Sequence, residues 1–290
     1  MNNQKSKQTV AIFGSGYVGN YLKNVNTLST RVYNKRDHKY NQADILLDLL
    51  RSTKPNYVIN CCGYTGRPNV DACESDKQAC WDLNVNLPIT MATICKSLNI
   101  PYIHVSSGCI YTGYSNEFTE EHEPNFGLET DESSWYSKTK HAAEYSLKHL
   151  GAYIMRIRMP FCADDHDRNF LNKVLKYDNL IDFKNSMTCI EDFVAFLEKF
   201  IENIHNNVSE TKPGIYNVCN PGSISIKDIV KLFNSHGKVN ANWSFVDIKS
   251  LNLAANRSNC VLDCTKIEKL GLGLPSVNVS VEKCIRELCK

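Results

Sequence analysis

A glycine-rich turn near the start of the chain constrains the fold more than any other feature. The apolar run Thr9–Phe13 has the length of a strand and leads into the glycine pattern at residues 14–19, which a helix-like segment follows through Val25. In such a pattern the first glycine makes a tight turn, the second admits a pyrophosphate to the backbone, and the third lets helix and strand pack closely. A plain glycine turn is the alternative, but the flanking strand and helix favour a dinucleotide site. Its expected residues are Gly14, Gly16, Tyr17, Val18 and Gly19.

The residues after the second expected strand bear on the choice of dinucleotide. Residues 30–33 form this strand, which ends in Asn34, Lys35 and Arg36. An NAD-binding chain usually has an acidic residue here to hold the ribose 2′-hydroxyl. Two cations would instead match a 2′-phosphate, Arg36 above all. We therefore expect NADPH, with NADH as the weaker alternative; a solvated basic turn is the other interpretation.

Short apolar runs alternate with helix-like segments along most of the chain. This alternation predicts an α/β fold, a doubly wound Rossmann-type parallel sheet with a smaller C-terminal substrate-binding region. Beyond Pro160 the pattern becomes less regular. We expect residues 1–160 and 189–219 to form the NADP-binding domain, and residues 161–188 and 220–290 the substrate-binding region. Later strands are expected at residues 57–62, 101–105, 152–157 and 214–218, and helices at 43–53, within 71–98 and at 191–202.

Polar residues follow two neighbouring strands at the edge where ligands bind in open α/β sheets. From the first of these strands we expect four residues to face the cofactor: Cys61, Cys62, Gly63 and Tyr64. The next strand brings Ser106 to Cys109 to the same edge.

A tyrosine and a lysine one helical turn apart supply the chemistry of ketone reduction by a nicotinamide. Tyr136 and Lys140 share one helix face, and Ser107 offers a hydroxyl at the end of an apolar strand. The ammonium should lower the phenol pKa from about 10, so that Tyr136 donates a proton near neutral pH. An ordinary amphipathic helix is the alternative interpretation.

Composition narrows the classes of function. The chain has 290 residues and a net charge of +2, so nucleic acid is a poor candidate partner. Residues 1–10 are polar and no apolar run approaches membrane-spanning length, which predicts a cytoplasmic protein without a membrane contact. The thirteen cysteines are scattered and form no paired zinc pattern, so we expect mostly buried thiols and no metal site.

With these motifs in this order, the chain resembles an extended short-chain dehydrogenase/reductase. More narrowly, it resembles the plant nucleotide-rhamnose synthase/epimerase-reductase family, which converts UDP-4-keto-6-deoxyglucose to UDP-rhamnose with NADPH. The resemblance spans nearly the whole chain. It is carried by residues 63–71, 106–110, 136–140, 156–160, 168–170, 185–188 and 257–259.

The resemblance implies a role for each matched residue. Ser107, Tyr136 and Lys140 would be the reductase residues, and Cys109 and Lys173 the acid/base pair of a 3,5-epimerase. Inverting a carbon beside a ketone requires one group to remove its proton and another to return one from the opposite face, through an enolate. Cys109 needs a nearby positive group to be ionised, because a free cysteine has a pKa of about 8.5. The implied substrate-binding residues are Thr65, Arg67, Asn169, Asn185, Met187 and Arg257.

For three of these residues an ordinary structural role is the alternative. Cys109 could be a small buried residue, Lys173 a solvated helix residue, and Arg257, our candidate for binding the diphosphate bidentately, a surface ion pair.

Three other functions are weighed against a bifunctional enzyme. The first is a reductase alone, similar to bacterial dTDP-4-dehydrorhamnose reductase, in which an acidic residue and an aromatic stand where this chain has Gly108 and Cys109. The second is a GDP-fucose synthase, which has a similar cysteine but a histidine acid; His166 is the nearest histidine. The third is a non-catalytic regulatory subunit of the same fold, as in methionine adenosyltransferase.

The remaining expectations come from pathway logic or stay open. An upstream 4,6-dehydratase must supply the keto sugar, since none is attached. A homodimer is left open, and the choice of UDP over dTDP depends on the resemblance alone.

Overall fold

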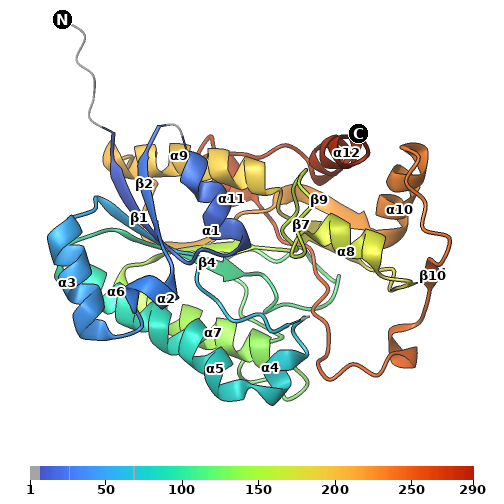
Figure 1. Cartoon of the computed structure of the whole chain (residues 1–290), viewed down its shortest axis with the longest axis horizontal. Coiled ribbons are helices and arrows are strands. Elements are labelled where there is room, and N and C mark those ends of the chain that lie inside the picture. The colour runs from blue at the N-terminus through green and yellow to red at the C-terminus, as the bar shows by residue number, and fades with distance from the viewer. Residues whose placement is uncertain (1–6, 26, 68) are drawn as a thin grey trace, which may run out of the picture.

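A parallel sheet of six strands forms the centre of the molecule (Figure 1). The computed structural model describes residues 7–25, 27–67 and 69–290, so the expected polar stretch at residues 1–6 and Pro68 of the motif at 63–71 lie outside the described residues. In spatial order the strands are β2 (Ser29–Tyr33), β1 (Thr9–Phe13), β3 (Tyr57–Asn60), β4 (Tyr102–Ser107), β5 (Tyr153–Ile157) and β8 (Gly214–Asn217). Every neighbouring pair is parallel, which confirms the predicted fold class.

The order of the strands predicts where a ligand crevice lies. From β1 the sheet grows outward through β2 on one side and through β3 on the other. In open α/β sheets, ligands bind beyond the carboxyl ends of the strands at such a reversal. The loops after β1, β3 and β4 therefore meet at the expected binding edge.

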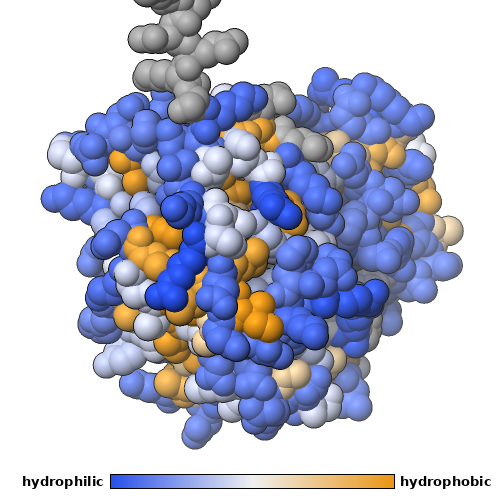
Figure 2. Space-filling model, turned by 60° about the vertical axis from the view of Figure 1, so that its left-hand side comes forward, coloured by the Kyte–Doolittle hydropathy of each residue, from blue (hydrophilic) through white to orange (hydrophobic). Residues whose placement is uncertain are grey.

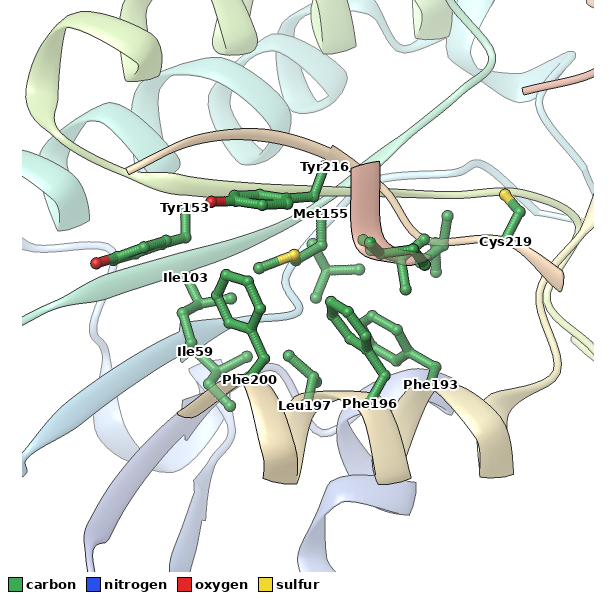
Figure 3. Packing of buried hydrophobic residues seen from close by; sticks show 14 of the residues in the cluster. Ile59, Ile103, Tyr153, Met155, Phe193, Phe196, Leu197, Phe200, Tyr216 and Cys219 are labelled. Carbon is green, nitrogen blue, oxygen red and sulfur yellow. The ribbon is translucent and has the colours of Figure 1, made fainter. Parts of the chain in front are cut away.

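Successive residues of each strand face opposite sides of the sheet, which explains why the strands are apolar throughout. In β1, Val10 and Ile12 belong to one core and Ala11 and Phe13 to the other. The first core is covered by α9 (Ile190–His205), whose Phe193, Phe196, Leu197 and Phe200 point toward the strands in Figure 3. The second core packs on α3 (Ala43–Thr53), α6 (Leu87–Ser97) and α7 (Trp135–Leu147).

A third apolar core lies to the right in Figure 1, built from later parts of the chain. Strands β7 (Lys184–Met187) and β9 (Asn220–Ser225) pair antiparallel there, and β6 (Asn179–Leu180) pairs with β10 (Ser244–Phe245). The Thr188 amide donates to the Arg158 oxygen and the Thr188 hydroxyl accepts from the Arg158 amide, which joins this region to the end of β5. The helices of this core are α8 (Phe170–Lys176), α10 (Ile226–Ser235) and α12 (Val277–Leu288).

Several element boundaries differ from the sequence expectation. The strand expected at residues 57–62 ends at Asn60, because the Asn60 side chain accepts a hydrogen bond from the Cys62 amide and turns the chain out of the sheet. The helix expected through Val25 is α1 (Tyr17–Tyr21) followed by the 3₁₀ turn η1 (Leu22–Asn24). The helical stretch within 71–98 is broken into α4 (Ala72–Ser75), α5 (Lys77–Trp81), the π-helical turn η2 (Asp82–Asn86) and α6.

The surface is mostly polar. On the face shown in Figure 2, apolar residues form small groups separated by hydrophilic ones. Among the described residues, no helix has both the length and the apolar character needed to cross a membrane. The thirteen cysteines are free thiols, ten of them buried, as the sequence predicted for most of them.

Candidate active site

The glycine-rich turn folds tightly against the loop that follows β3. Gly14 has a φ of +102°, and a Cβ on it would lie 2.9 Å from the backbone of Cys61 and Cys62. A Cβ on Gly19 would lie 1.8 Å from the Gly14 oxygen, so neither position accepts a side chain. At Gly16 the same test meets nothing within 4 Å. The turn thus presents an open backbone surface at its second glycine, which fits a pyrophosphate.

The end of β2 presents two cationic side chains to solvent. Asn34 caps α2 (Lys35–His38), its side chain accepting a hydrogen bond of 2.8 Å from the Asp37 amide. Lys35 and Arg36 occupy the first turn of α2, and both are exposed. This cap fixes where the two cations stand, next to the glycine turn at the end of β1, because β1 and β2 pair in register.

Ser107, Tyr136 and Lys140 are brought together at the carboxyl edge of the sheet. Ser107 is the last residue of β4, and α7 carries the other two after a cap in which Ser134 accepts from the Ser137 amide. The Ser107 hydroxyl lies close enough to the phenol of Tyr136 to lower its pKa. The Lys140 Nζ lies 3.5 Å from the Val105 oxygen and 3.8 Å from the Cβ position of Gly63.

The expected lowering of the Tyr136 pKa by Lys140 is wrong for the protein as described. Burial, followed by the effect of Cys109, raises the pKa of this phenol above its usual value, and the nearby Ser107 hydroxyl offsets only part of the rise. Burial also lowers the pKa of Lys140. Desolvation outweighs the ammonium here because both groups are almost fully enclosed. Tyr136 is therefore a firmly protonated phenol, the form that donates a proton.

A buried asparagine in the π-helical turn supports this edge. The Asn84 side chain accepts from the Tyr64 amide at 2.7 Å and donates to the Tyr64 oxygen at 3.0 Å. It also donates to the Thr139 hydroxyl of α7, at 3.0 Å. Asn84 thus fixes the loop after β3 to the helix of Tyr136. Sequence reasoning assigned it no role, although an Asn-x-Asn pattern within an otherwise helical segment was a visible signal.

A buried ion pair accepts a hydrogen bond from Ser106, the residue before Ser107 in the sequence. Arg156 donates to Glu144 through Nη2 at 2.7 Å and Nε at 2.9 Å, and both side chains are at most 3% exposed. The Ser106 hydroxyl donates to the other Glu144 oxygen at 2.6 Å, and Arg156 Nη1 donates to the Tyr111 hydroxyl at 2.9 Å. This network ties β4, β5 and α7 together one residue away from Ser107. No local sequence pattern indicates this pairing.

The two residues expected to form the epimerase pair stand in different surroundings. Cys109 is half-buried in the loop after β4, packs against the Tyr136 cluster, and its amide donates to the Ser107 hydroxyl at 3.2 Å. Its sulfur lies 3.9 Å from Nη1 of Arg158. Lys173 is partly buried on α8, where burial and the charge of Arg168 lower its pKa.

His166, the acid of the GDP-fucose synthase alternative, is engaged in contacts within the protein. Its ring stacks on Tyr17 with 4.5 Å between centroids, and its Nδ1 accepts from the Arg168 amide at 3.0 Å.

Of the six expected substrate-binding residues, three lie in or face the loop after β3. Arg67 is exposed, and the Thr65 hydroxyl accepts from Arg168 at 3.0 Å. Arg257 forms a bidentate ion pair with Asp71, with N–O distances of 2.7 and 2.9 Å, and this guanidinium holds the pKa of the Asp71 carboxyl below its usual value. A diphosphate role for Arg257 would therefore compete with Asp71.

The other three substrate candidates are enclosed. Asn169 caps α8 and bonds the backbone of Cys162 and Leu171. Met187 lies in the third core, and the Asn185 oxygen accepts from Arg158 and from the Cys260 amide.

One group of residues has the side chains of a metal site. The ligand atoms of Cys189, Glu191 and Cys284 lie within 4.8 Å of one another. The Cys189 thiol donates to Glu191 at 3.0 Å, so hydrogen bonding already satisfies the carboxylate. The group lies in the third core, and nothing in its geometry connects it to the edge described above.

Comparison with known proteins places the chain in a family. A family model described as the RmlD substrate binding domain matches residues 9–289. A curated Arabidopsis thaliana protein, the bifunctional dTDP-4-dehydrorhamnose 3,5-epimerase/dTDP-4-dehydrorhamnose reductase, is 31% identical over 288 residues, covering 95% of this chain and 92% of that protein.

Solved structures agree in fold. The L780 UDP-rhamnose synthase of Acanthamoeba polyphaga mimivirus superposes with a TM-score of 0.86 at 24% identity, covering 97% of this chain and 99% of that one. The dTDP-4-dehydrorhamnose reductase of Bacillus anthracis, solved in complex with NADP, gives a TM-score of 0.81 at 19% identity, covering 97% and 98%. From the family match and the Arabidopsis relative together, the chain belongs to the RmlD substrate binding domain family.

Proposed function

We propose that the protein is an NADPH-dependent bifunctional enzyme, a 3,5-epimerase and 4-keto reductase that converts UDP-4-keto-6-deoxy-D-glucose to UDP-L-rhamnose. The observation that carries this proposal is the arrangement at the end of β4. Ser107 and Cys109 stand on either side of Gly108 and both meet Tyr136, so the groups needed for reduction and for proton abstraction share one edge.

The residues around the glycine turn fit a dinucleotide. The open backbone at Gly16 would accept the pyrophosphate, and the loop of Cys61, Cys62, Gly63 and Tyr64 would line the crevice beside it. Asn34, Lys35 and Arg36 would hold the ribose, and the two exposed cations favour a 2′-phosphate. NADPH, when bound, supplies the hydride for C4 of the sugar. The Bacillus anthracis structure of the same fold holds NADP.

Ser107 and Tyr136 would act on the O4 oxygen of the sugar. Both hydroxyls stand at one point of the edge, where they can hold a carbonyl oxygen by hydrogen bonds. As negative charge develops on O4, the protonated phenol of Tyr136 donates its proton. Lys140, held against the Val105 oxygen, positions the cofactor and the phenol.

The epimerase function depends on Cys109 and Lys173. In its thiolate form, Cys109 would remove the protons from C3 and from C5, and Ser107 and Tyr136 would stabilise the enolate oxygen formed from the neighbouring ketone. Lys173 would return a proton from the opposite face. Burial and the charge of Arg168 lower its pKa, which makes it easier for the ammonium to release a proton.

The relatives support this proposal in different respects. The Arabidopsis protein carries both activities in its name, and the chain covers 92% of its length. The mimivirus neighbour is a UDP-rhamnose synthase, which favours UDP over dTDP. An upstream 4,6-dehydratase would supply the keto sugar. Thr65, Arg67, Asn169, Asn185, Met187 and Arg257 remain the proposed substrate-binding residues.

A single incubation tests the proposal. The purified protein is given UDP-4-keto-6-deoxyglucose and NADPH with no other enzyme, and the sugar product is identified by NMR. UDP-L-rhamnose is the expected product. If NADPH is consumed only after an external 3,5-epimerase is added, the protein is a reductase alone and the roles of Cys109 and Lys173 are wrong.

Replacing the cysteine separates the two activities. Cys109→Ser should abolish solvent deuterium exchange at C3 and C5 while leaving reduction of the pre-epimerised ketone intact. Equal loss of both activities would contradict the assignment. If a GDP-sugar competes for the site better than UDP, the choice of nucleotide is overturned.

A further inference from the structure

Arg158 is a fully enclosed arginine at the end of β5. Its side chain is 1% exposed, yet every strong hydrogen bond it makes is to a neutral acceptor. Nη1 donates to the Gly108 oxygen at 3.1 Å and to the Ser258 hydroxyl at 3.0 Å, and Nη2 donates to the Asn185 side chain and the Ser258 oxygen. Nε has no hydrogen-bond partner among the described residues.

A second buried arginine, two residues earlier in the chain, provides a comparison for Arg158. Arg156 is equally buried, but it is paired with the Glu144 carboxylate at 2.7 Å. Within residues 7–25, 27–67 and 69–290, Arg158 forms no ion pair with a carboxylate. A buried cation without a counter-charge is strongly destabilising. The site of Arg158 therefore favours an anion.

The acidic side chains that face Arg158 are cysteines and one tyrosine. Cys109 has its sulfur 3.9 Å from Nη1, and Cys219, Cys260 and Tyr114 are also in electrostatic contact. Cys219 is fully enclosed; burial opposes its ionisation, but the neighbouring Cys264 thiol, a hydrogen bond from Thr188 and the charge of Arg158 lower its pKa. Burial raises the pKa of Cys260 to about 11. Cys109 alone among the three cysteines is partly exposed.

The loop that carries Cys109 is built around this arginine. A Cβ on Gly108 would lie 2.9 Å from the Arg158 Cγ and 2.6 Å from the Leu262 side chain. Glycine at this position lets the loop rest on the guanidinium. Three other titratable groups face Cys109: Tyr136, Lys140 and Cys260. Of these only Lys140 is cationic, and it is directed to the Val105 oxygen.

We propose that Arg158 is a positioning residue that stabilises the thiolate form of Cys109 and thereby prepares it to remove the sugar proton. This inference rests on the proposed function, since it gives the epimerase base its missing counter-charge. An opposite charge within about 4–6 Å favours ionisation by roughly one to three pH units. Asn185 and Ser258 hold the guanidinium in place beneath the loop.

The test measures ionisation of Cys109 directly and without substrate. The full-length protein is alkylated with iodoacetamide at a series of pH values, and the rate at Cys109 is read from its peptide by mass spectrometry. Cys289 is an internal control, because it is also partly exposed but lies at the end of α12. In Arg158→Met, the midpoint for Cys109 should rise by at least about one pH unit, and its rate at pH 7 should fall about tenfold. The Cys289 profile should not move.

A charge-preserving variant and the wild type complete the test. Arg158→Lys keeps the positive charge and should restore most of the wild-type midpoint of Cys109. If Arg158 only anchored the loop by packing, the charge of the lysine would not restore it. An unchanged Cys109 profile in a folded Arg158→Met protein would overturn the proposal and assign the counter-charge to Cys219. If Arg158→Met does not fold, the wild type decides: a Cys109 midpoint at or above about 8.5, the value of a free cysteine, refutes the inference. Because no epimerisation is measured, this result is independent of the proposed function.

Discussion

Replacing Glu144 with glutamine should destabilise the whole protein, because it leaves the Arg156 charge buried without a partner. The carboxylate accepts two hydrogen bonds from Arg156 and one from Ser106, and both charged side chains are at most 3% exposed. Removing one member of a buried pair costs about 3–5 kcal/mol. That is a large part of the roughly 5–15 kcal/mol that keeps a domain folded.

Urea unfolding followed by circular dichroism measures this loss. With an m-value of about 3 kcal/mol/M, the Glu144→Gln midpoint should fall by about 1–1.7 M. Ser106→Ala is the matched control, since it removes one hydrogen bond to the same carboxylate and should cost only about 1 kcal/mol.

A double variant distinguishes the buried charge from a simple packing defect. In Glu144→Leu with Arg156→Met, neither charge remains, so this protein should be more stable than Glu144→Gln alone. If Glu144→Gln unfolds within about 0.5 kcal/mol of the wild type, the pair does not hold β4, β5 and α7 together and our reasoning is refuted.

Three further predictions address the site and the core. Tyr136→Phe should slow reduction by about 10²- to 10⁴-fold while NADPH binding, followed by fluorescence, changes little; retained reduction would exclude Tyr136 as the proton donor. Arg36→Gln should raise the KM for NADPH about tenfold or more and leave that for NADH unchanged, whereas equal effects on both would remove the 2′-phosphate assignment. Burial lowers the pKa of His104 well below 6.5, so the unfolded chain binds a proton that the folded one does not, and stability should fall as pH drops below about 6.5 by up to about 1.4 kcal/mol per unit. His104→Gln should flatten the pH dependence of the urea midpoint between pH 6.5 and 5, and an equally steep dependence would contradict this origin.

The central sheet could be predicted from the sequence because its strands are buried on both faces. Such strands appear as short apolar runs, and the glycine turn set the direction of the first βαβ unit. The later strands β7 and β9 were not recognised, since they contain buried polar residues: Asn185, Ser186 and Asn220. These polar side chains are buried and hydrogen-bonded within the protein. They interrupt the apolar pattern by which a strand is recognised in a sequence.

The candidate site also contains residues that could be predicted from the sequence and residues that could not. Tyr136 and Lys140 have the fixed spacing of one helical turn and Ser107 follows an apolar strand, so the sequence alone could place them at one edge. Glu144, Arg156 and Arg158 act through contacts between elements far apart in the chain, which no local pattern encodes. The direction of the Tyr136 pKa was missed because burial, the larger effect, becomes visible only in three dimensions.

The position of α9 has a consequence for synthesis of the chain on the ribosome. This helix supplies the aromatic layer over one face of β1, β3, β4 and β5, but it is encoded after all four strands (Figure 3). β8, which completes the sheet beside β5, is translated later still. A nascent chain that has emerged only as far as residue 160 carries Ile12, Ile59, Ile103 and Met155 on a bare apolar face. Such transiently exposed apolar surface makes the partly synthesised chain prone to aggregation.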